Sequence, residues 1–199
     1  YGGRCSALGG QTGSFNNVIS NNNGAYPCTG IAVSANTCIS GLYLASYAQG
    51  LSSNTQQPYI LTGMSFNNVS IACSVFEQAI FTSDTMQNVN ATSVFFDTCT
   101  FDSANQTGSI FTNCTFTDCS FVNTNFSKVT FTNCSFNNCD LTRATTDSNT
   151  KFNGCSFTDG TKINHIALNK SSLANMTVSG ADLTGTNFKG SNVSHATFI

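Results

Sequence analysis

Ten cysteines are the most reactive side chains of this 199-residue chain, and six of them are regularly spaced. A separation of 20 or 21 residues divides the six into two series: Cys99, Cys119 and Cys139, and Cys114, Cys134 and Cys155. If about 20 residues complete one structural unit, each series forms a column in which neighbours lie within disulfide distance. A column of three permits only one such bond. The alternative is that these cysteines fill small apolar positions as free thiols.

The other four cysteines lie towards the N-terminus: Cys5, Cys28, Cys38 and Cys73. A Cys28–Cys38 loop and a Cys5–Cys73 link are candidate disulfides, although spacing alone does not define the connectivity. The chain has no CxxC pair and no histidine cluster, so we expect no zinc site.

Nine Asn-x-Ser/Thr sequons could carry N-linked glycans if the chain enters a secretory pathway. They begin at Asn68, Asn90, Asn105, Asn113, Asn125, Asn133, Asn169, Asn175 and Asn192. Much of this number follows from the abundance of Asn, Ser and Thr, and Asn113 and Asn133 could instead form a structural Asn ladder. We nevertheless expect several of the sites to be glycosylated.

Residues for acid–base or nucleophilic catalysis do not form a recognisable constellation. The two histidines, His165 and His195, stand alone, and the carboxylates are scattered along the chain. No glycine loop for phosphate binding and no nucleophile elbow is present. The sequence therefore predicts a protein that is not an enzyme and has no cofactor.

A period of five residues organises the part of the chain that must position these side chains. Large apolar residues recur at this interval from Leu61, and the clearest run is Phe111, Phe116, Phe121, Phe126, Phe131 and Phe136. A small residue stands two positions before each, and Thr, Ser, Asn or Asp fills most positions between. This pattern describes a short strand followed by a corner. Four such units form a square coil of about 20 residues, and coils stack about 4.8 Å apart. The sequons and the histidines then fall at outward or corner positions.

The register slips by one residue after Thr146 and again before Ile163. A corner can absorb each extra residue as a bulge. Three polar residues stand at nominally inward positions: Asp84, Gln106 and Thr146. We expect a bulge to turn Asp84 outward, and we expect the face that carries Gln106 and Thr146 to bulge or to hold water.

The segment Ala181-Asp182-Leu183-Thr184-Gly185 and its neighbours resemble the pentapeptide-repeat family. The resemblance implies an all-β fold, a right-handed quadrilateral β-helix with about seven coils over residues 59–199. Residues 1–58 lack the period and are expected to form an irregular N-terminal cap or assembly arm. Some proteins of this family imitate DNA and inhibit topoisomerases, which requires a strongly acidic surface that this nearly neutral chain lacks.

Outward apolar residues of the expected solenoid are candidates for an interface. They are Ile60, Val75, Ile80, Phe95, Phe198 and Ile199. The first four should stack in pairs at the N-terminal end of the solenoid, where either residues 1–58 or another subunit could cover them. The last two finish an open end of the sheet, which is a template for further strands.

Composition narrows the function. Charged residues make up 8% of the chain and the net charge is −2, which does not suit a nucleic-acid or anionic-membrane partner. No apolar stretch is long enough to span a membrane. A chain that starts at Tyr1 without Met is consistent with a processed, secreted protein.

We therefore predict a structural glycoprotein that is secreted to the extracellular space or cell surface. It would self-associate as a subunit of a filament, surface appendage, coat or matrix, using the open solenoid ends and the N-terminal arm. The alternatives are an extracellular glycan-binding or adhesive module, an ice-binding protein and a DNA-mimicking topoisomerase inhibitor.

Overall fold

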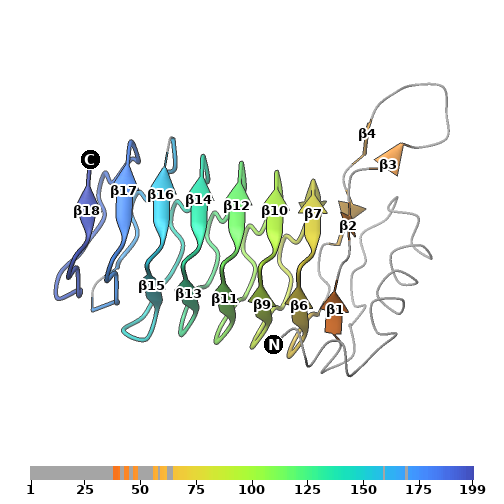
Figure 1. The fold of residues 1–199 in the computed structure, drawn as a ribbon, viewed down its shortest axis with the longest axis horizontal. Coiled ribbons are helices and arrows are strands. Elements are labelled where there is room, and N and C mark those ends of the chain that lie inside the picture. The colour runs from red at the N-terminus through yellow and green to blue at the C-terminus, as the bar shows by residue number, and fades with distance from the viewer. Residues whose placement is uncertain are drawn as a thin grey trace.

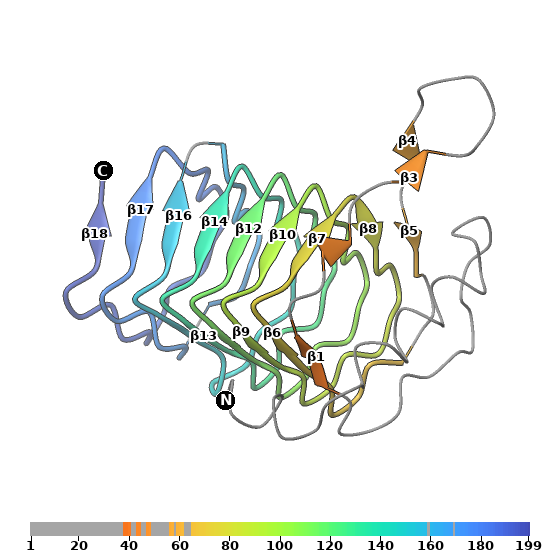
Figure 2. The ribbon, with the colours of Figure 1, turned by 45° about the vertical axis from the view of Figure 1, so that its right-hand side comes forward.

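The computed structural model describes residues 38–40, 43–44, 47–48, 56–57, 59–61, 65–158, 160–168 and 170–199. Parallel strands stack along one axis in Figure 1, and the turned view in Figure 2 shows the chain winding around successive faces. The strands are short because a corner interrupts the extended backbone after two or three residues. The architecture confirms the predicted all-β fold, a right-handed quadrilateral β-helix.

The longest sheet, called here the eight-stranded sheet, forms one face. In spatial order its strands are β18 (Thr197–Phe198), β17 (Thr177–Ser179), β16 (Ser156–Thr158), β14 (Ser135–Asn137), β12 (Thr115–Thr117), β10 (Phe95–Asp97), β7 (Val75–Glu77) and β2 (Tyr43–Leu44). The six-stranded sheet forms the adjoining face with β1 (Cys38–Ser40), β6 (Ser70–Ala72), β9 (Asn90–Thr92), β11 (Ile110–Thr112), β13 (Thr130–Thr132) and β15 (Lys151–Asn153). From β7 to β18 the eight-stranded sheet contains one strand for each of the seven predicted coils.

The other two faces contain mostly single bridges. Strands β5 (Tyr59–Ile60) and β8 (Ala79–Ile80) pair in parallel and begin the third face, which bridges continue as far as Asp182. The fourth face consists of single bridges, from the bridge between Ser65 and Thr85 to the bridge between Ala167 and Asn187. Strands β3 (Tyr47–Ala48) and β4 (Gln56–Gln57) form a separate antiparallel pair.

Strand pairing keeps corresponding residues of successive coils side by side. In the regular coils the paired residues are 20 positions apart. The interval becomes 21 between Thr130 and Lys151, and 22 between Asp140 and Lys162. Both predicted slips of one residue are therefore confirmed, and each lies where the chain turns from one face to the next.

Each regular corner turns at a residue with positive φ, two positions after the central inward residue. Among the described residues, 19 that are not glycine adopt this left-handed conformation. Asn tolerates it better than most residues with a Cβ, and Gly adopts it freely. At Gly154 a Cβ would lie 2.5 Å from Oδ1 of Asn133 in the preceding coil, so the two corners pack closely. The left-handed corner conformation thus favours the Asn and Gly residues that recur there, although other residue types also adopt it.

Stacked phenylalanine rings fill the interior. The ring centroids of Phe116 and Phe136 lie 5.0 Å apart with an interplanar angle of 13°. Phe121, on the next face, meets Phe116 edge-on with the centroids 5.2 Å apart. Stacked and edge-on contacts of this kind add to the stabilisation that burial itself supplies.

The inward polar residues correct one expectation. Asp84 and Gln106 are both fully buried, so the prediction that a bulge turns Asp84 outward is wrong. The backbone hydrogen bonds that join successive coils continue through both residues. The amide of Asn105 donates to the carbonyl of Asp84 at 2.9 Å, and the amide of Gln106 donates to the carbonyl of Asn125 at 3.0 Å. A continuous ladder keeps the alternation of side chains, which holds both residues inside. Thr146 is half-buried, at the first slip, and its hydroxyl donates to a carbonyl of the next coil.

Strands β1 and β2 lie within residues 1–58, where we expected an irregular cap. They pair in parallel with β6 and β7, and Ile39 is fully buried next to Ile71. They extend two faces of the solenoid by one strand each, while most of the expected cap lies outside the described residues. Within the described part there is no helix of the length and apolarity that a membrane crossing requires.

Candidate binding surface

The six regularly spaced cysteines form the two predicted columns inside the solenoid, and all six are buried free thiols. In one column the thiols of Cys99, Cys119 and Cys139 donate to carbonyl oxygens of the preceding coil at 3.2 to 3.3 Å. The hydroxyls of Ser109 and Thr124 make the same contact. At these positions the small inward residue is a compact hydrogen-bond donor, which agrees with the free-thiol alternative.

The two disulfides expected near the N-terminus have different outcomes. Cys73 is free and exposed, at a corner with a φ of 47°, so the predicted Cys5–Cys73 link is absent. Its position at a corner turns the side chain towards solvent. The Cys28–Cys38 pairing stays a prediction, because Cys28 and the side chain of Cys38 lie outside the described part of the chain.

Three of the buried thiols, those of Cys114, Cys119 and Cys134, have a pKa above that of a free cysteine. The hydrogen bond with Cys134, together with burial, raises the pKa of Cys114. Burial, and then the contacts with Cys139 and Cys99, raise the pKa of Cys119. At Cys134 the contact with Cys114 acts to lower the pKa, but the hydrogen bond with Cys155 and burial raise it to about 12. Because the thiolate is the nucleophilic form, the raised pKa makes Cys114, Cys119 and Cys134 unreactive near neutral pH.

We expect iodoacetamide at mildly alkaline pH to alkylate Cys73 in the folded protein and to leave both columns unmodified. Exposure favours reaction at Cys73, whereas burial shields the thiols of both columns from the reagent. Peptide mass spectrometry before and after unfolding in guanidinium measures the difference. If Cys119 reacts as fast as Cys73 in the folded protein, the buried, protonated assignment of the column is wrong.

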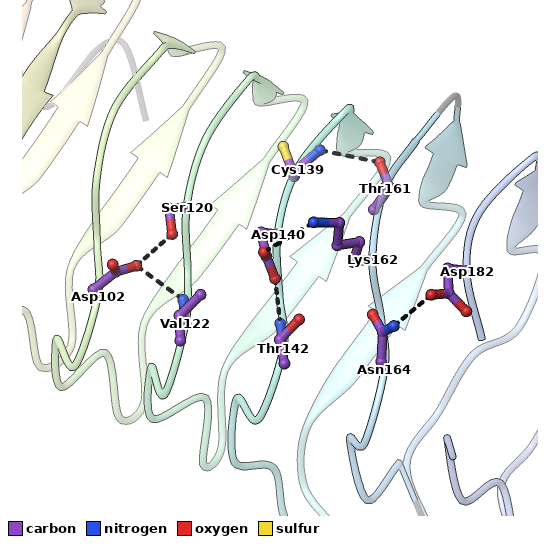
Figure 3. Close-up of polar contacts among 10 residues, drawn as sticks. All are labelled: Asp102, Ser120, Val122, Cys139, Asp140, Thr142, Thr161, Lys162, Asn164 and Asp182. Atoms are coloured by element: carbon purple, nitrogen blue, oxygen red, sulfur yellow. Dashed lines mark hydrogen bonds and ion pairs between the residues drawn. The ribbon is translucent and has the colours of Figure 1, made fainter. Parts of the chain in front are cut away.

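Carboxylates of the third face contact polar groups of the following coil (Figure 3). Oδ1 of Asp102 accepts hydrogen bonds from the hydroxyl of Ser120 at 2.5 Å and from the amide of Val122 at 3.0 Å. Nζ of Lys162 lies 3.7 Å from Oδ2 of Asp140. These contacts tie coils together and do not pair carboxylates across a cleft. That the protein is not an enzyme stays a prediction.

Two further carboxylates are oriented by local donors. The hydroxyl and the amide of Thr184 lower the pKa of Asp182. At Asp147 slight burial acts in the opposite direction, but hydrogen bonds from the amides of Lys128 and Asn149 hold the pKa of the carboxyl below its usual value. Both groups are anionic at neutral pH, and Asp147 closes the turn that absorbs the first register slip.

The histidines lie at corners, as their place in the period predicts. His165 and His195 both have positive φ, and the imidazole of His165 lies over Gly185 of the next coil. In the part of the chain that the structure describes, no three or more His, Cys, Asp or Glu side chains are grouped to hold a metal ion.

The outer side of the eight-stranded sheet carries an exposed aromatic ring, Phe95, with 55% of its surface accessible. Phe95 pairs with Val75 in the preceding strand and with Thr115 in the following one. Both neighbours are smaller than the ring, so neither covers it. Ile60 pairs with Ile80 on the third face. The two predicted apolar stacks are therefore confirmed in register, while their role as interfaces stays a prediction.

The remaining outward apolar residues lie elsewhere. Phe198 and Ile199 are exposed on the last coil, at 50% and 84%. Ile110, which the interface prediction did not include, is 43% exposed on the six-stranded sheet between Asn90 and Thr130. The five-residue period already places Ile110 outward, so this residue could have been found from the sequence.

Acidic side chains accompany Phe95. Asp97 is two residues further along the same strand and lies on the same side of the sheet. Glu77 occupies the position beside Asp97 in the register of β7 and β10, and Asp118 is exposed at the corner after the next strand. Between Arg4 and Lys128 the chain has no Lys, Arg or His, but it has five acids: Glu77, Asp84, Asp97, Asp102 and Asp118. The net charge of −2 for the whole chain conceals this segregation. Asp84 is buried, and the other four acids give the described coils before Lys128 a negative surface.

The described sequons occupy two kinds of position. The exposed corner residues are Asn68, Asn113, Asn133 and Asn175, and those outward on strands or bridges are Asn90, Asn105, Asn125 and Asn192. Asn169 lies outside the described residues. Nδ2 of Asn125 donates to Oδ1 of Asn105 at 3.5 Å and to the hydroxyl of Thr107 at 3.3 Å, so these two sequons belong to an amide ladder.

Two family models match separate parts of the solenoid. The model for the SV2A/B/C luminal domain matches residues 59–141, and the model for pentapeptide repeats, in eight copies, matches residues 166–199. The second match covers the same repeat that the coil geometry shows. The predicted resemblance to the pentapeptide-repeat family is therefore confirmed by the family model over residues 166–199 and by the fold.

Solved pentapeptide-repeat structures resemble the chain in fold. QnrB1, a plasmid-mediated fluoroquinolone resistance protein, aligns with a TM-score of 0.54 at 14% identity over 83% of this chain and 87% of its own. Rfr23, from the cyanobacterium Cyanothece 51142, aligns with a TM-score of 0.46 at 10% identity over 93% and 99%. No curated protein matches in sequence.

The prediction of a self-assembling filament, coat or matrix subunit is wrong, whereas the predicted extracellular location stays a prediction. The finding that contradicts the subunit prediction is the fold shared with QnrB1, which is a plasmid-mediated fluoroquinolone resistance protein. The prediction relied on an open sheet edge, but every solenoid has such edges, so an edge does not distinguish an assembling subunit from a binding protein. The expectation that nucleic acid is not a partner stays a prediction.

Proposed function

We propose that the pentapeptide solenoid is a protein-binding module that presents a rigid outer face to a partner protein. The observation that carries this proposal is Phe95, whose ring is more than half exposed on a face of mostly small polar side chains. Large aromatic side chains supply a disproportionate share of the free energy of protein association. An exposed ring on an otherwise polar face is therefore a natural anchor.

The interior supports this use of the face. Directly beneath Phe95, the buried Phe96 stacks on Phe76 and Phe116 with centroid separations of 5.4 and 5.0 Å. The backbone of β10 pairs on both sides, with β7 and β12. A side chain on such a support loses little freedom on binding, which reduces the entropy cost of association.

We also propose that the module works in a lumen or outside the cell. Two observations support this compartment. The family model that matches residues 59–141 is described as a luminal domain, and four of the sequons lie at exposed corners. Glycosylation requires passage through the secretory pathway, so its presence tests the compartment.

Binding can be tested by selecting displayed random peptides on the intact protein and measuring the affinity of purified hits by calorimetry. We expect dissociation constants in the micromolar range, below about 100 μM. Protein unfolded by guanidinium and then bound to the same surface is the control, and it should retain none of these peptides. If no selected peptide binds the folded chain within this range, the proposed function is wrong.

Expression through a eukaryotic secretory pathway tests the compartment. We expect a peptide N-glycosidase to reduce the mass of the secreted protein, with occupied sites mapping first to Asn68, Asn113, Asn133 and Asn175, because these corners are exposed. Asn105 and Asn125 should be less occupied, since their amides bond within a ladder. A chain that is retained in the cell, or secreted without any glycan, would contradict the proposal.

A further inference from the structure

We propose that the partner segment that docks on β7, β10 and β12 is basic, and that one of its Arg or Lys side chains lies over the ring of Phe95 and pairs with Asp97. This inference rests on the proposed protein-binding function and adds to it the place and the chemistry of recognition. The occupant is a short extended segment of another protein.

The ring of Phe95 offers an open face to a cation. Its neighbours in the same column, Val75 and Thr115, are too small to cover it, and 55% of its surface is accessible. The face of an aromatic ring carries partial negative charge and attracts a guanidinium or ammonium group. Arg suits such a site best, because its planar group can stack on the ring and donate hydrogen bonds at its edge at the same time.

The acceptor for those hydrogen bonds lies beside the ring. Asp97 is two residues along the same strand, about 7 Å from Phe95 and on the same side of the sheet. The hydroxyl of Thr98 donates to Oδ1 of Asp97 at 2.9 Å, which orients the carboxylate. At the next corner, Nδ2 of Asn138 donates to Oδ1 of Asp118 at 2.6 Å. Both donors are neutral, so neither cancels the charge of the carboxylate that it orients.

Charge complementarity selects a basic partner. Among the described residues from β7 to β18, no outward residue on a strand of the eight-stranded sheet is Lys, Arg or His, and the one histidine at a corner beside these strands, His195, precedes β18 in the last coil. The described basic residues begin at Lys128, and apart from His195 they lie on the other faces and corners. A cation from a partner would therefore meet Asp97 and Asp118 without repulsion from this face, and its approach would be accelerated at low ionic strength.

The size of the patch favours a short segment. One exposed ring and a few carboxylates over three strands form a much smaller surface than the roughly 800 Å² that each partner buries in a stable dimer. Outward positions beyond β12, such as Ser135 and Asn137, are small and polar and offer no second anchor. A short segment with one basic side chain beside an apolar one is large enough to contact both the ring and the carboxylates of this patch.

The test uses the intact chain and three variants. Phe95→Thr gives the position the residue that its column neighbour Thr115 already has, so folding should be retained. Asp97→Asn removes the charge at nearly constant volume. The matched control is Ile110→Thr on the six-stranded sheet, which copies Thr130 in its own column. Circular dichroism confirms that each variant folds.

Peptides selected on the unmodified protein are then measured against each variant. We expect the selected sequences to be enriched in Arg and Lys beside an apolar residue. Phe95→Thr should weaken binding by at least about tenfold, and Asp97→Asn by about fivefold. Ile110→Thr should change the affinity less than about twofold. Raising the NaCl concentration should weaken binding to the unmodified protein more than binding to Asp97→Asn.

The outcomes separate the site from the function. If peptides bind but Phe95→Thr has no effect, the docking site is wrong and the protein-binding function remains. If the selected sequences are acidic or lack basic residues, the proposed chemistry is overturned. A dimer in sedimentation that Phe95→Thr abolishes would make a second copy of the chain the occupant and would also overturn the proposal. If no peptide binds, the proposed function fails together with this inference.

Discussion

Replacing Phe116 by Ala is expected to lower the free energy of unfolding by about 3–5 kcal/mol, the range for removing a fully buried phenylalanine. The ring has no exposed surface and stacks on Phe96 and Phe136, with both centroid separations at 5.0 Å. It also meets the edges of rings on the adjoining faces, such as Phe121. A cavity here removes contacts in three coils, and rigid stacking above and below limits collapse.

Guanidinium denaturation followed by far-ultraviolet circular dichroism measures this loss. A solenoid is stabilised by contacts between neighbouring coils, so a defect at Phe116 should also broaden the transition or divide it in two. Thr117→Ala, one residue along the same strand but outward, is the control and should change the stability by less than about 0.5 kcal/mol. A loss at Phe116 that is no larger than the loss in this control would contradict the assignment of the phenylalanine columns as the main source of stability.

Replacing Gln106 by Met is expected to raise the free energy of unfolding by about 1–3 kcal/mol. Gln106 is fully buried in a column between Met86 and Phe126. Its Nε2 lies 4.0 Å from the sulfur of Met86, and its Oε1 has no hydrogen-bond partner. Met has nearly the same shape as Gln and carries no group that must be desolvated, so the substitution removes the penalty and leaves the packing unchanged.

The same denaturation experiment measures the gain, and Gln87→Met is the matched control. Gln87 is the outward neighbour of Met86 and is half-buried, so the same chemical change there should alter the stability by less than about 0.5 kcal/mol. Equal stability of Gln106→Met and the unmodified protein would mean that Oε1 is satisfied by an ordered water, which the sequence-based expectation allowed for this face.

Much of the fold could be predicted because the repeat is local and redundant. A large residue such as Phe121 recurs every five positions, and Asn or Gly recurs at corners such as Asn123 and Gly154. The sequence of each repeat therefore indicates which residue points inward and where the corner lies. Because neighbouring repeats show the same pattern, each supports the assignment of the next. Both register slips were predictable for the same reason, since a single extra residue shifts every later Phe by one position.

The errors arise where a single residue opposes the pattern. The charge of Asp84 suggested an outward bulge, but the hydrogen bonds of its own backbone keep the alternation and hold it inside. The cooperative ladder of many coils outweighs the preference of one side chain. The cysteine columns were correctly aligned, yet spacing alone could not distinguish disulfides from thiols, because both need the same separation between coils.

The five-residue pattern alone was enough to define the coil, the two slips and the inward columns of Phe and Cys, because each depends on contacts between residues close in the chain or one regular turn apart. The candidate binding surface required the folded arrangement. Asp118 comes near Phe95 and Asp97 only when β10 and β12 pair, and the accessibility of the ring depends on the size of Val75 and Thr115 beside it. The exposure of a side chain and the clustering of charges both depend on residues that adjacent coils place side by side. Only the stacking of the coils determines which residues those are.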